Sequence, residues 1–184
     1  MIGVGDSKWM RVIEKYYSDN PPLKELLIVH SRCVADKALR VAVAHPELNL
    51  DSVFIEEAAM LHDIGIFMTD AAPIHCFGSH PYICHGYLGA ELLEKERLPR
   101  HALVAERHTG TGLSLEQIVE RGLPVPHRDM IPISMEEKVI CFADKFFSKT
   151  HPEREKNVDE VVSSLSKFGE DTLSRFRLWC VQFL

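Results

Sequence analysis

The sequence lacks the features that mark membrane, secreted and nucleic-acid-binding proteins. Its apolar runs, such as residues 26–29, fall far short of the roughly 20 residues that a membrane-spanning helix needs. Its first residues show no basic region followed by an apolar stretch. No run of Lys and Arg is longer than two residues and the net charge is −6, so the chain has no basic stripe to hold a long nucleic acid. We therefore expect a protein without a membrane anchor or a long nucleic-acid partner.

Paired cysteines are lacking as well. The chain has five cysteines, an odd number, and no Cys-x-x-Cys pair. This set favours reduced thiols and a cytoplasmic location over a disulfide framework. The cysteines are Cys33, Cys76, Cys84, Cys141 and Cys180.

Signals of β-structure are also scarce, since no pair of alternating segments is joined by an Asn-Gly or Asp-Gly turn. Apolar residues instead recur at helical spacing almost throughout, which predicts an all-α fold. The 184 residues, 46% of them hydrophobic and 26% charged, suit one globular domain with a sizeable core. We expect a single domain over residues 1–184, with its core at about 21–150 and packing helices at 151–184.

Capping residues and prolines place the ends of the expected helices. Ser7 is a candidate N-cap, Pro21 and Pro22 can open the second helix, and Ser134 with Glu137 forms a capping box. Gly65 is expected to end the third helix in a left-handed turn, and the long loop that follows, residues 66–79, has the length of a lid. The expected helices cover residues 7–17, 21–44, 51–65, 81–97, 99–108, 114–122 and 134–147, followed by two between 153 and 184.

Three expected helices carry an ionisable residue on an otherwise apolar face, namely His30, His62 and Asp144. Taken alone, an inward histidine is more often a hydrogen-bonded core residue, and a buried aspartate is often a cap or the partner of an arginine. Together with Asp63, which adjoins His62, they favour a bound cation, because a buried carboxylate needs one, or several hydrogen-bond donors, to offset its desolvation. The chain has ten histidines, and histidine is the commonest metal ligand.

Residues 57–67 read Glu-Ala-Ala-Met-Leu-His-Asp-Ile-Gly-Ile-Phe, with His30 upstream and Asp144 far downstream. In order and spacing this set resembles the HD superfamily of metal-dependent phosphohydrolases, over about residues 23–149. The chain looks closest to small uncharacterised HDIG-type members. The resemblance implies a multi-helix bundle with a metal site between its core helices. His85-Gly86 and His108 resemble two further histidines of members that are similar to symmetrical dinucleoside tetraphosphatases and hold two metal ions.

The resemblance implies a ligand set for two divalent ions. His30, His62, Asp63 and Asp144 would hold one ion, and Asp63 would bridge to a second ion held by His85 and His108. Four imidazoles and two carboxylates suit iron or manganese first, with zinc, cobalt and nickel also compatible. The implied activity is hydrolysis of a phosphate ester or anhydride by a metal-activated, bridging hydroxide, with His62 and Asp63 at the catalytic centre.

One departure from the family pattern concerns a cation for the phosphate. Some HD phosphodiesterases carry lysine directly after His-Asp-x-Gly, whereas this chain has Ile66, which argues against cleavage of cyclic dinucleotides. Arg107, Lys145 and His80 are the candidates to replace that lysine. Arg107 can equally form an ion pair at the surface. His80 lies beside the expected lid and can instead be simply exposed to solvent. Lys145 would point about 100° away from Asp144 on an ideal helix and is interpreted as solvated.

The favoured substrate is a small phosphorylated compound, either a nucleotide or another phosphate ester or anhydride. Two other functions stay open. A di-iron oxygenase can occupy the same scaffold, since some HD proteins resemble this ligand set yet activate oxygen, and a metal- or nucleotide-binding module would keep the fold without turnover. A homo-oligomer is compatible with the sequence, and residues 66–79 and 122–132, which would set specificity, carry no readable code.

Overall fold

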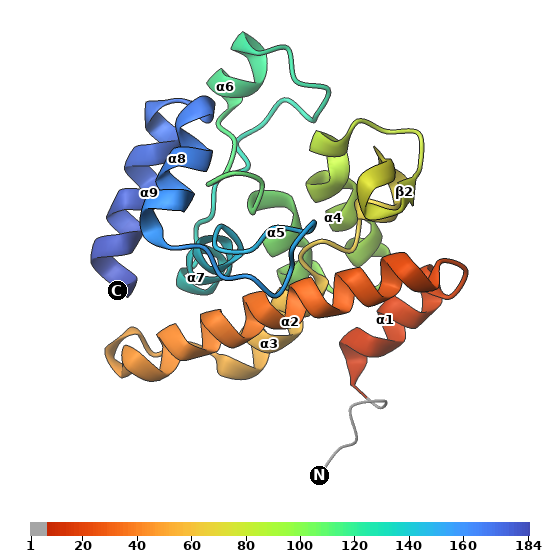
Figure 1. Ribbon diagram of the computed structural model, residues 1–184, viewed down its shortest axis with the longest axis horizontal. Coiled ribbons are helices and arrows are strands. Elements are labelled where there is room, and N and C mark those ends of the chain that lie inside the picture. Colours follow the sequence, from red (N-terminus) through yellow and green to blue (C-terminus); the bar gives the residue numbers. More distant parts are fainter. Residues whose placement is uncertain (1–6) are drawn as a thin grey trace.

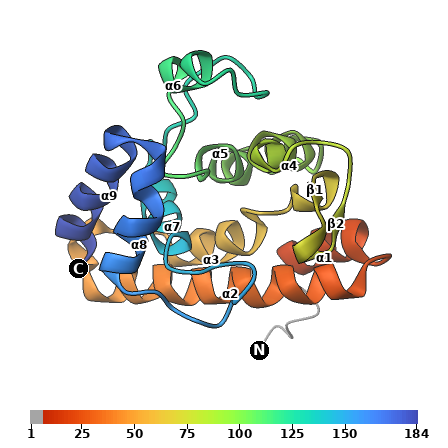
Figure 2. The same ribbon diagram turned by 45° about the horizontal axis from the view of Figure 1, so that its top comes forward.

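The computed structural model describes residues 7–184, which form nine α-helices, all but α6 (Leu115–Glu120) contributing to one main hydrophobic core. The long helix α2 (Pro21–Ala44) forms the base of the molecule, with α1 (Lys8–Tyr17), α3 (Ser52–Leu61) and α7 (Met135–Asp144) packed on it (Figures 1 and 2). The all-α prediction is confirmed. The other helices are α4 (His85–Lys95), α5 (Pro99–Arg107), α8 (Val158–Leu165) and α9 (Glu170–Phe183).

Helices α4 and α5 form a pair that lies across α3, while α8 and α9 form a hairpin at one end of the molecule (Figure 2). Helix α6 stands apart above α5, on a small second core of its own. No helix among residues 7–184 combines the length and the apolar character that crossing a membrane requires.

Local capping groups fix the helix ends where the sequence predicts them. The side chain of Asn20 accepts a hydrogen bond from the backbone of Leu23 at the start of α2, ahead of two prolines that have no N–H to satisfy. Ser134 and Glu137 form the predicted capping box of α7. These bonds satisfy backbone donors that no helix can pair internally, so they stabilise the observed starts.

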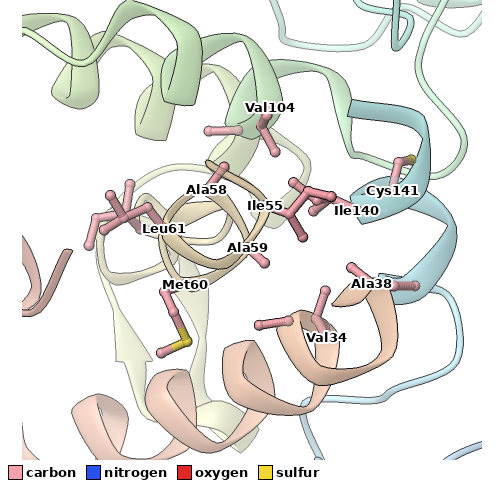
Figure 3. Packing of buried hydrophobic residues seen from close by; sticks show 14 of the residues in the cluster. Val34, Ala38, Ile55, Ala58, Ala59, Met60, Leu61, Val104, Ile140 and Cys141 are labelled. Atoms are coloured by element: carbon pink, nitrogen blue, oxygen red, sulfur yellow. The ribbon is translucent and has the colours of Figure 1, made fainter. Parts of the chain in front are cut away.

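Helix α3 lies at the centre of the core (Figure 3). On α3, Ile55 lies beside Ile140 of α7 and Ala59 faces Val34 of α2, while Ala58 faces Val104 of α5 (Figure 3). The alanines have little bulk, which lets the neighbouring helices approach α3 closely. This packing holds the end of α3, and with it the His62–Asp63 pair that follows directly, in a fixed position.

The predicted loop at residues 66–79 is wrong in part, because the segment is folded. It contains 3₁₀ turns at Ile66–Met68 and Ala72–Ile74 and an antiparallel pair of strands, β1 (Asp70–Ala71) and β2 (Cys76–Phe77). Ile74 and Cys76 are buried and anchor it to the core. Strands of two residues are too short for apolar alternation, so the sequence pattern gave no sign of them.

The predicted left-handed turn at Gly65 is also wrong, since its φ is −84°. Glycine is needed there for a close approach instead. A Cβ at this position would lie 2.2 Å from the carbonyl oxygen of His85 and 2.5 Å from the backbone nitrogen of Gly89. The absence of side chains at Gly65 and Gly89 therefore lets the start of α4, which carries His85, lie directly against the end of α3.

Candidate metal centre

Six side chains that are far apart in the sequence meet at the centre of the helix bundle. They come from the middle of α2, the end of α3, the start of α4, the end of α5 and the end of α7. Their ligand atoms form two groups, each within 4.8 Å, and all six residues are buried. The first group is His30, His62, Asp63 and Asp144, and the second is Asp63, His85 and His108. The structure thus brings together every ligand that the sequence suggests.

Asp63 joins the two groups through its two oxygens. Oδ2 lies 3.2 Å from His30 Nε2 and 3.1 Å from His62 Nε2. Oδ1 lies 3.2 Å from His108 Nε2 and 3.5 Å from His85 Nε2. One buried carboxylate therefore faces imidazoles on both sides, as a bridging ligand would.

Three of the histidines are held in one tautomer by the backbone. Each of them directs Nδ1 at the carbonyl oxygen three residues earlier. For His62 and His108 this carbonyl lies in the last turn of α3 and α5, and for His85 it lies in the 3₁₀ turn Tyr82–Cys84 ahead of α4. A carbonyl only accepts, so Nδ1 is the donor, and in the neutral ring Nε2 then carries a lone pair. The pairs are His62 with Ala59 (2.6 Å), His85 with Tyr82 (2.7 Å) and His108 with Ala105 (2.7 Å).

With Nδ1 as the donor, the Nε2 lone pairs of these histidines face one another and the carboxylate of Asp63. Nε2 of His85 lies 3.1 Å from Nε2 of His108, and both also face Asp63 Oδ1. Lone pairs at such distances repel one another unless a cation lies among them. Neutral imidazole nitrogens with a second-shell carbonyl, together with carboxylate oxygens, are the donor set that divalent metals take in proteins. The residues therefore fit metal ions.

The pKa values of the two histidines in the second group favour their neutral, metal-binding form. Burial, together with the neighbouring His108, lowers the pKa of His85 to about 3. Burial also lowers the pKa of His108, although Asp63 opposes this. Burial lowers the pKa of His62 too, but the carboxylates of Asp63 and Asp144 outweigh it and raise that pKa to about 9. His85 and His108 are thus neutral near pH 7, which is the form that binds a metal.

Two lysines lie at the same site. Lys149 Nζ is 2.6 Å from Asp63 Oδ2, and Lys145 Nζ is 2.7 Å from Asp144 Oδ2 and donates to the carbonyl of His108 at 3.0 Å. Their side chains are only 14% and 10% exposed. Burial would raise the pKa of each aspartate, but His62 with Lys149 holds that of Asp63, and Lys145 that of Asp144, well below the usual range.

The solvated interpretation of Lys145 is therefore wrong. Lys145 keeps helical backbone angles as the C-cap of α7, with φ −62° and ψ −22°, but its long side chain still reaches Asp144 and the carbonyl of His108. Lys149 was missed altogether. It lies in a turn beyond the helix, where no spacing rule relates it to Asp63.

Two other candidates lie elsewhere. Arg107 pairs with Glu137 in the first turn of α7, at 2.9 and 3.2 Å, and its guanidinium is engaged there. His80 is exposed, and its backbone pairs with Met68 and Asp70 beside the small hairpin. His101 is buried, with Nε2 3.2 Å from a carboxylate oxygen of Glu57. The structure thus does not bring Arg107 or His80 to the six ligands.

A cavity of about 540 Å³ opens onto the centre. His85, His108 and Asp144 line its inner end together with Lys145 and Lys149. A larger groove of about 700 Å³ lies beyond Lys149, along residues 149–154, but none of the six ligands lines it. The smaller cavity is therefore the one through which a substrate reaches the ligands.

Comparison with known proteins agrees with this site. The sequence model of the HD domain matches residues 27–148. An uncharacterized protein of Methanocaldococcus jannaschii is 32% identical over 149 residues, which cover 78% of this chain and 77% of that protein. No solved structure gave a significant match.

Two relatives carry a named activity. The tRNA (cytidine(56)-2′-O)-methyltransferases of Picrophilus torridus and Thermoplasma volcanium are 34% identical over 125 residues and 30% identical over 153 residues. The matched parts cover 67% and 82% of this chain but only 32% and 40% of those enzymes. The chain thus spans between about a third and two fifths of their length.

Proposed function

This chain belongs to the HD domain family of metal-dependent phosphohydrolases, and we propose that it hydrolyses a small phosphate ester or anhydride. One observation carries the proposal: Asp63 lies between two groups of buried ligands, with three imidazoles locked in the metal-binding tautomer. We do not assign methyl transfer to this chain, because it spans only a minor part of the two methyltransferases.

The donor set suits two divalent ions, with iron or manganese as the first choice. His30, His62, Asp63 and Asp144 would hold one, and Asp63, His85 and His108 the other. When bound, such ions supply an activated water as nucleophile and neutralise charge on the phosphoryl oxygens.

Lys145 and Lys149 are the groups that we assign to the phosphate. Both ammonium groups lie among the ligands and line the cavity, so they can supply the positive charge that Ile66 does not. Burial opposes their charge, but Asp144 raises the pKa of Lys145, and Asp63 with Tyr82 raises the pKa of Lys149 well above its usual value. Both therefore stay cationic and would bind and orient phosphoryl oxygens.

The test combines metal analysis of the purified protein with phosphate release from a panel of esters and anhydrides, while oxygen uptake is recorded. We expect about two metal ions per chain, phosphate release and no oxygen uptake. Asp63→Ala should lose metal and phosphate release together while its helical circular dichroism persists, and Asp36→Ala, an exposed aspartate on α2, should lose neither.

Three outcomes would contradict the proposal. Full phosphate release by Asp63→Ala would place the chemistry elsewhere. Oxygen uptake without phosphate release would identify a di-iron oxygenase, and a metal-free protein without either activity would identify a binding module.

His85→Ala tests the second metal. We expect its metal content to fall to about one ion per chain, with His127→Ala, at an exposed position, as the matched control. An unchanged content of one ion in both variants would mean a single-metal site, with His85 and His108 available to the substrate instead.

A further inference from the structure

Beyond the metal centre, the cavity runs between two apolar walls that come from different parts of the chain. One wall belongs to the small core beneath α6, and the other to the α8–α9 hairpin, which lies beside it (Figure 1). The first wall consists of Ile83, Leu113 and Leu123, and the second of Leu165 and Phe168.

Hydrogen bonds tie the two walls together. Arg121, just after α6, donates to the carbonyl of Phe168 at 2.6 Å. Thr111 donates to the carbonyl of Thr172 at 3.2 Å, and Arg175 of α9 donates to the carbonyls of Thr111 and Gly112, both at 3.2 Å. These bonds hold the α8–α9 hairpin against the segments on either side of α6 and so help to set the separation of the two walls.

Few polar side chains line this space apart from the imidazoles of His85 and His108. They are three cations, one carboxylate and the hydroxyls of Tyr82, Thr109 and Thr172. Lys145 and Lys149 lie at the inner end and Arg121 lies at the rim. Among the described residues, Asp144 is the one carboxylate that lines the cavity, and no Asn or Gln does. The hydroxyl of Thr172 already donates to the carbonyl of Phe168. The space thus offers positive charge at its ends and hydrocarbon between.

These lining groups favour some classes of substrate over others. A nucleoside carries ribose hydroxyls and a base edge, and burying such groups without partners is costly. Pockets for them supply amides, carboxylates or free backbone groups at fixed positions. An alkyl or aryl group needs none of these and is favoured by removal from water. The walls therefore suit a hydrocarbon group better than a nucleoside.

We propose that the cavity binds the phosphate monoester of an apolar alcohol, with the phosphoryl group beside Lys145 and Lys149 and the hydrocarbon between the walls. This inference rests on the proposed hydrolysis. In the reaction, water forms a new P–O bond, the bond between phosphorus and the ester oxygen breaks, and the alcohol leaves with a proton. The products are the free alcohol and inorganic phosphate, and no oxidant or reductant is needed.

The test measures kcat/KM of the metal-loaded protein for methyl, butyl, hexyl and octyl phosphate, 1-naphthyl phosphate and the nucleoside 5′-monophosphates. We expect kcat/KM to rise about fourfold for each methylene group that is buried between the two walls. Octyl and naphthyl phosphate should exceed every nucleotide by at least about tenfold, because a nucleoside leaves buried polar groups unpaired.

Variants locate the effect. Leu123→Asn and Phe168→Ser place polar groups on opposite walls, and each should lower the octyl-to-methyl ratio of kcat/KM. Phe168 is 40% exposed, so its variant keeps the assay informative if Leu123→Asn fails to fold. Val181→Asn, on the outer face of α9 at 88% exposure, should keep the ratio of the unmodified protein.

The possible failures can be told apart. Efficient release from nucleotides, without a rise along the alkyl series, would overturn the apolar pocket but leave the phosphohydrolase standing. An unchanged octyl-to-methyl ratio in both folded wall variants would also overturn it. Absence of phosphate release from every compound would overturn both proposals.

Discussion

Replacing Lys149 with methionine would remove a buried positive charge and keep most of the side-chain volume. Lys149 Nζ lies 2.6 Å from Asp63 Oδ2, and this carboxylate is fully buried. Removing one partner of a buried ion pair costs about 3–5 kcal/mol, because the other charge stays buried without compensation. For a chain of this size, we expect the metal-free protein to melt about 6–20 °C lower.

Metal ions should reverse most of this loss. If the six ligands hold divalent ions, those ions supply positive charge to Asp63 in place of the ammonium group. We then expect the difference between Lys149→Met and the unmodified protein to shrink to about 1 kcal/mol, the size of an ordinary substitution. The assay is urea unfolding followed by circular dichroism, with a chelator in one series and saturating manganese in the other.

Lys37→Met is the matched control. Lys37 is also a buried lysine, with Nζ 2.7 Å from Glu155, but it lies outside the ligand groups. Its loss of stability should be the same with and without metal. If Lys149→Met showed that same metal-independent loss, the reasoning would be refuted, and Lys149 would be a structural ion pair that metal does not replace.

Three further predictions follow from contacts around the centre. Gly65→Ala should lower the free energy of unfolding by about 3 kcal/mol or more and lower the metal content, because its Cβ would overlap the His85 carbonyl. The control is Gly122→Ala, at a φ of 57° in open space, which should cost about 1–2 kcal/mol and keep the metal. Arg107→Ala should lower the free energy of unfolding by about 3 kcal/mol, because Glu137 stays buried without its partner, while kcat changes by less than about twofold. A hundredfold loss of kcat in the folded variant would instead assign Arg107 to catalysis. Metal must displace the proton that His62 holds with a pKa of about 9. The affinity for the metal, measured by competition with a chelator, should therefore rise about tenfold per pH unit up to about pH 9 and then level off. An affinity that does not change with pH would contradict this.

The helix ends could be predicted because their causes are local. Pro21 and Pro22 open α2, and Ser134 with Glu137 caps the first turn of α7, so each acts on its own helix start. The inward faces were also predictable, since helical periodicity alone places His30 and Asp144 in the core. The pairing of these faces into one centre needed more than periodicity and came from the family resemblance.

The rest depends on contacts between distant segments. Lys149 meets Asp63, and Arg107 meets Glu137, across separations for which no spacing rule exists. Gly65 was recognised as a helix end, but its reason is the backbone of α4 lying against it, which only packing reveals. The strands β1 and β2 are held by the core residues Ile74 and Cys76, not by a strand pattern of their own.

The position of the ligands at helix ends has an electrostatic consequence. His62, His108 and Asp144 terminate α3, α5 and α7, and the C-terminus of a helix carries about half a negative charge. The imidazoles use Nδ1 to satisfy the terminal carbonyls and keep Nε2 for a metal, so one residue serves both the helix end and the centre.

From the same arrangement we expect metal ions to bind before a phosphate does. Lys145 and Lys149 balance the charges of Asp144 and Asp63, and the cationic form of His62 offsets most of the partial negative charge of the three helix ends. Without metal the site thus has no surplus of positive charge to offset the desolvation of a phosphate dianion. Two divalent ions would add that positive charge, and Lys145 and Lys149 would then be free to donate to phosphoryl oxygens. We therefore expect phosphate binding to depend on metal binding, although the net charge of the chain is −6.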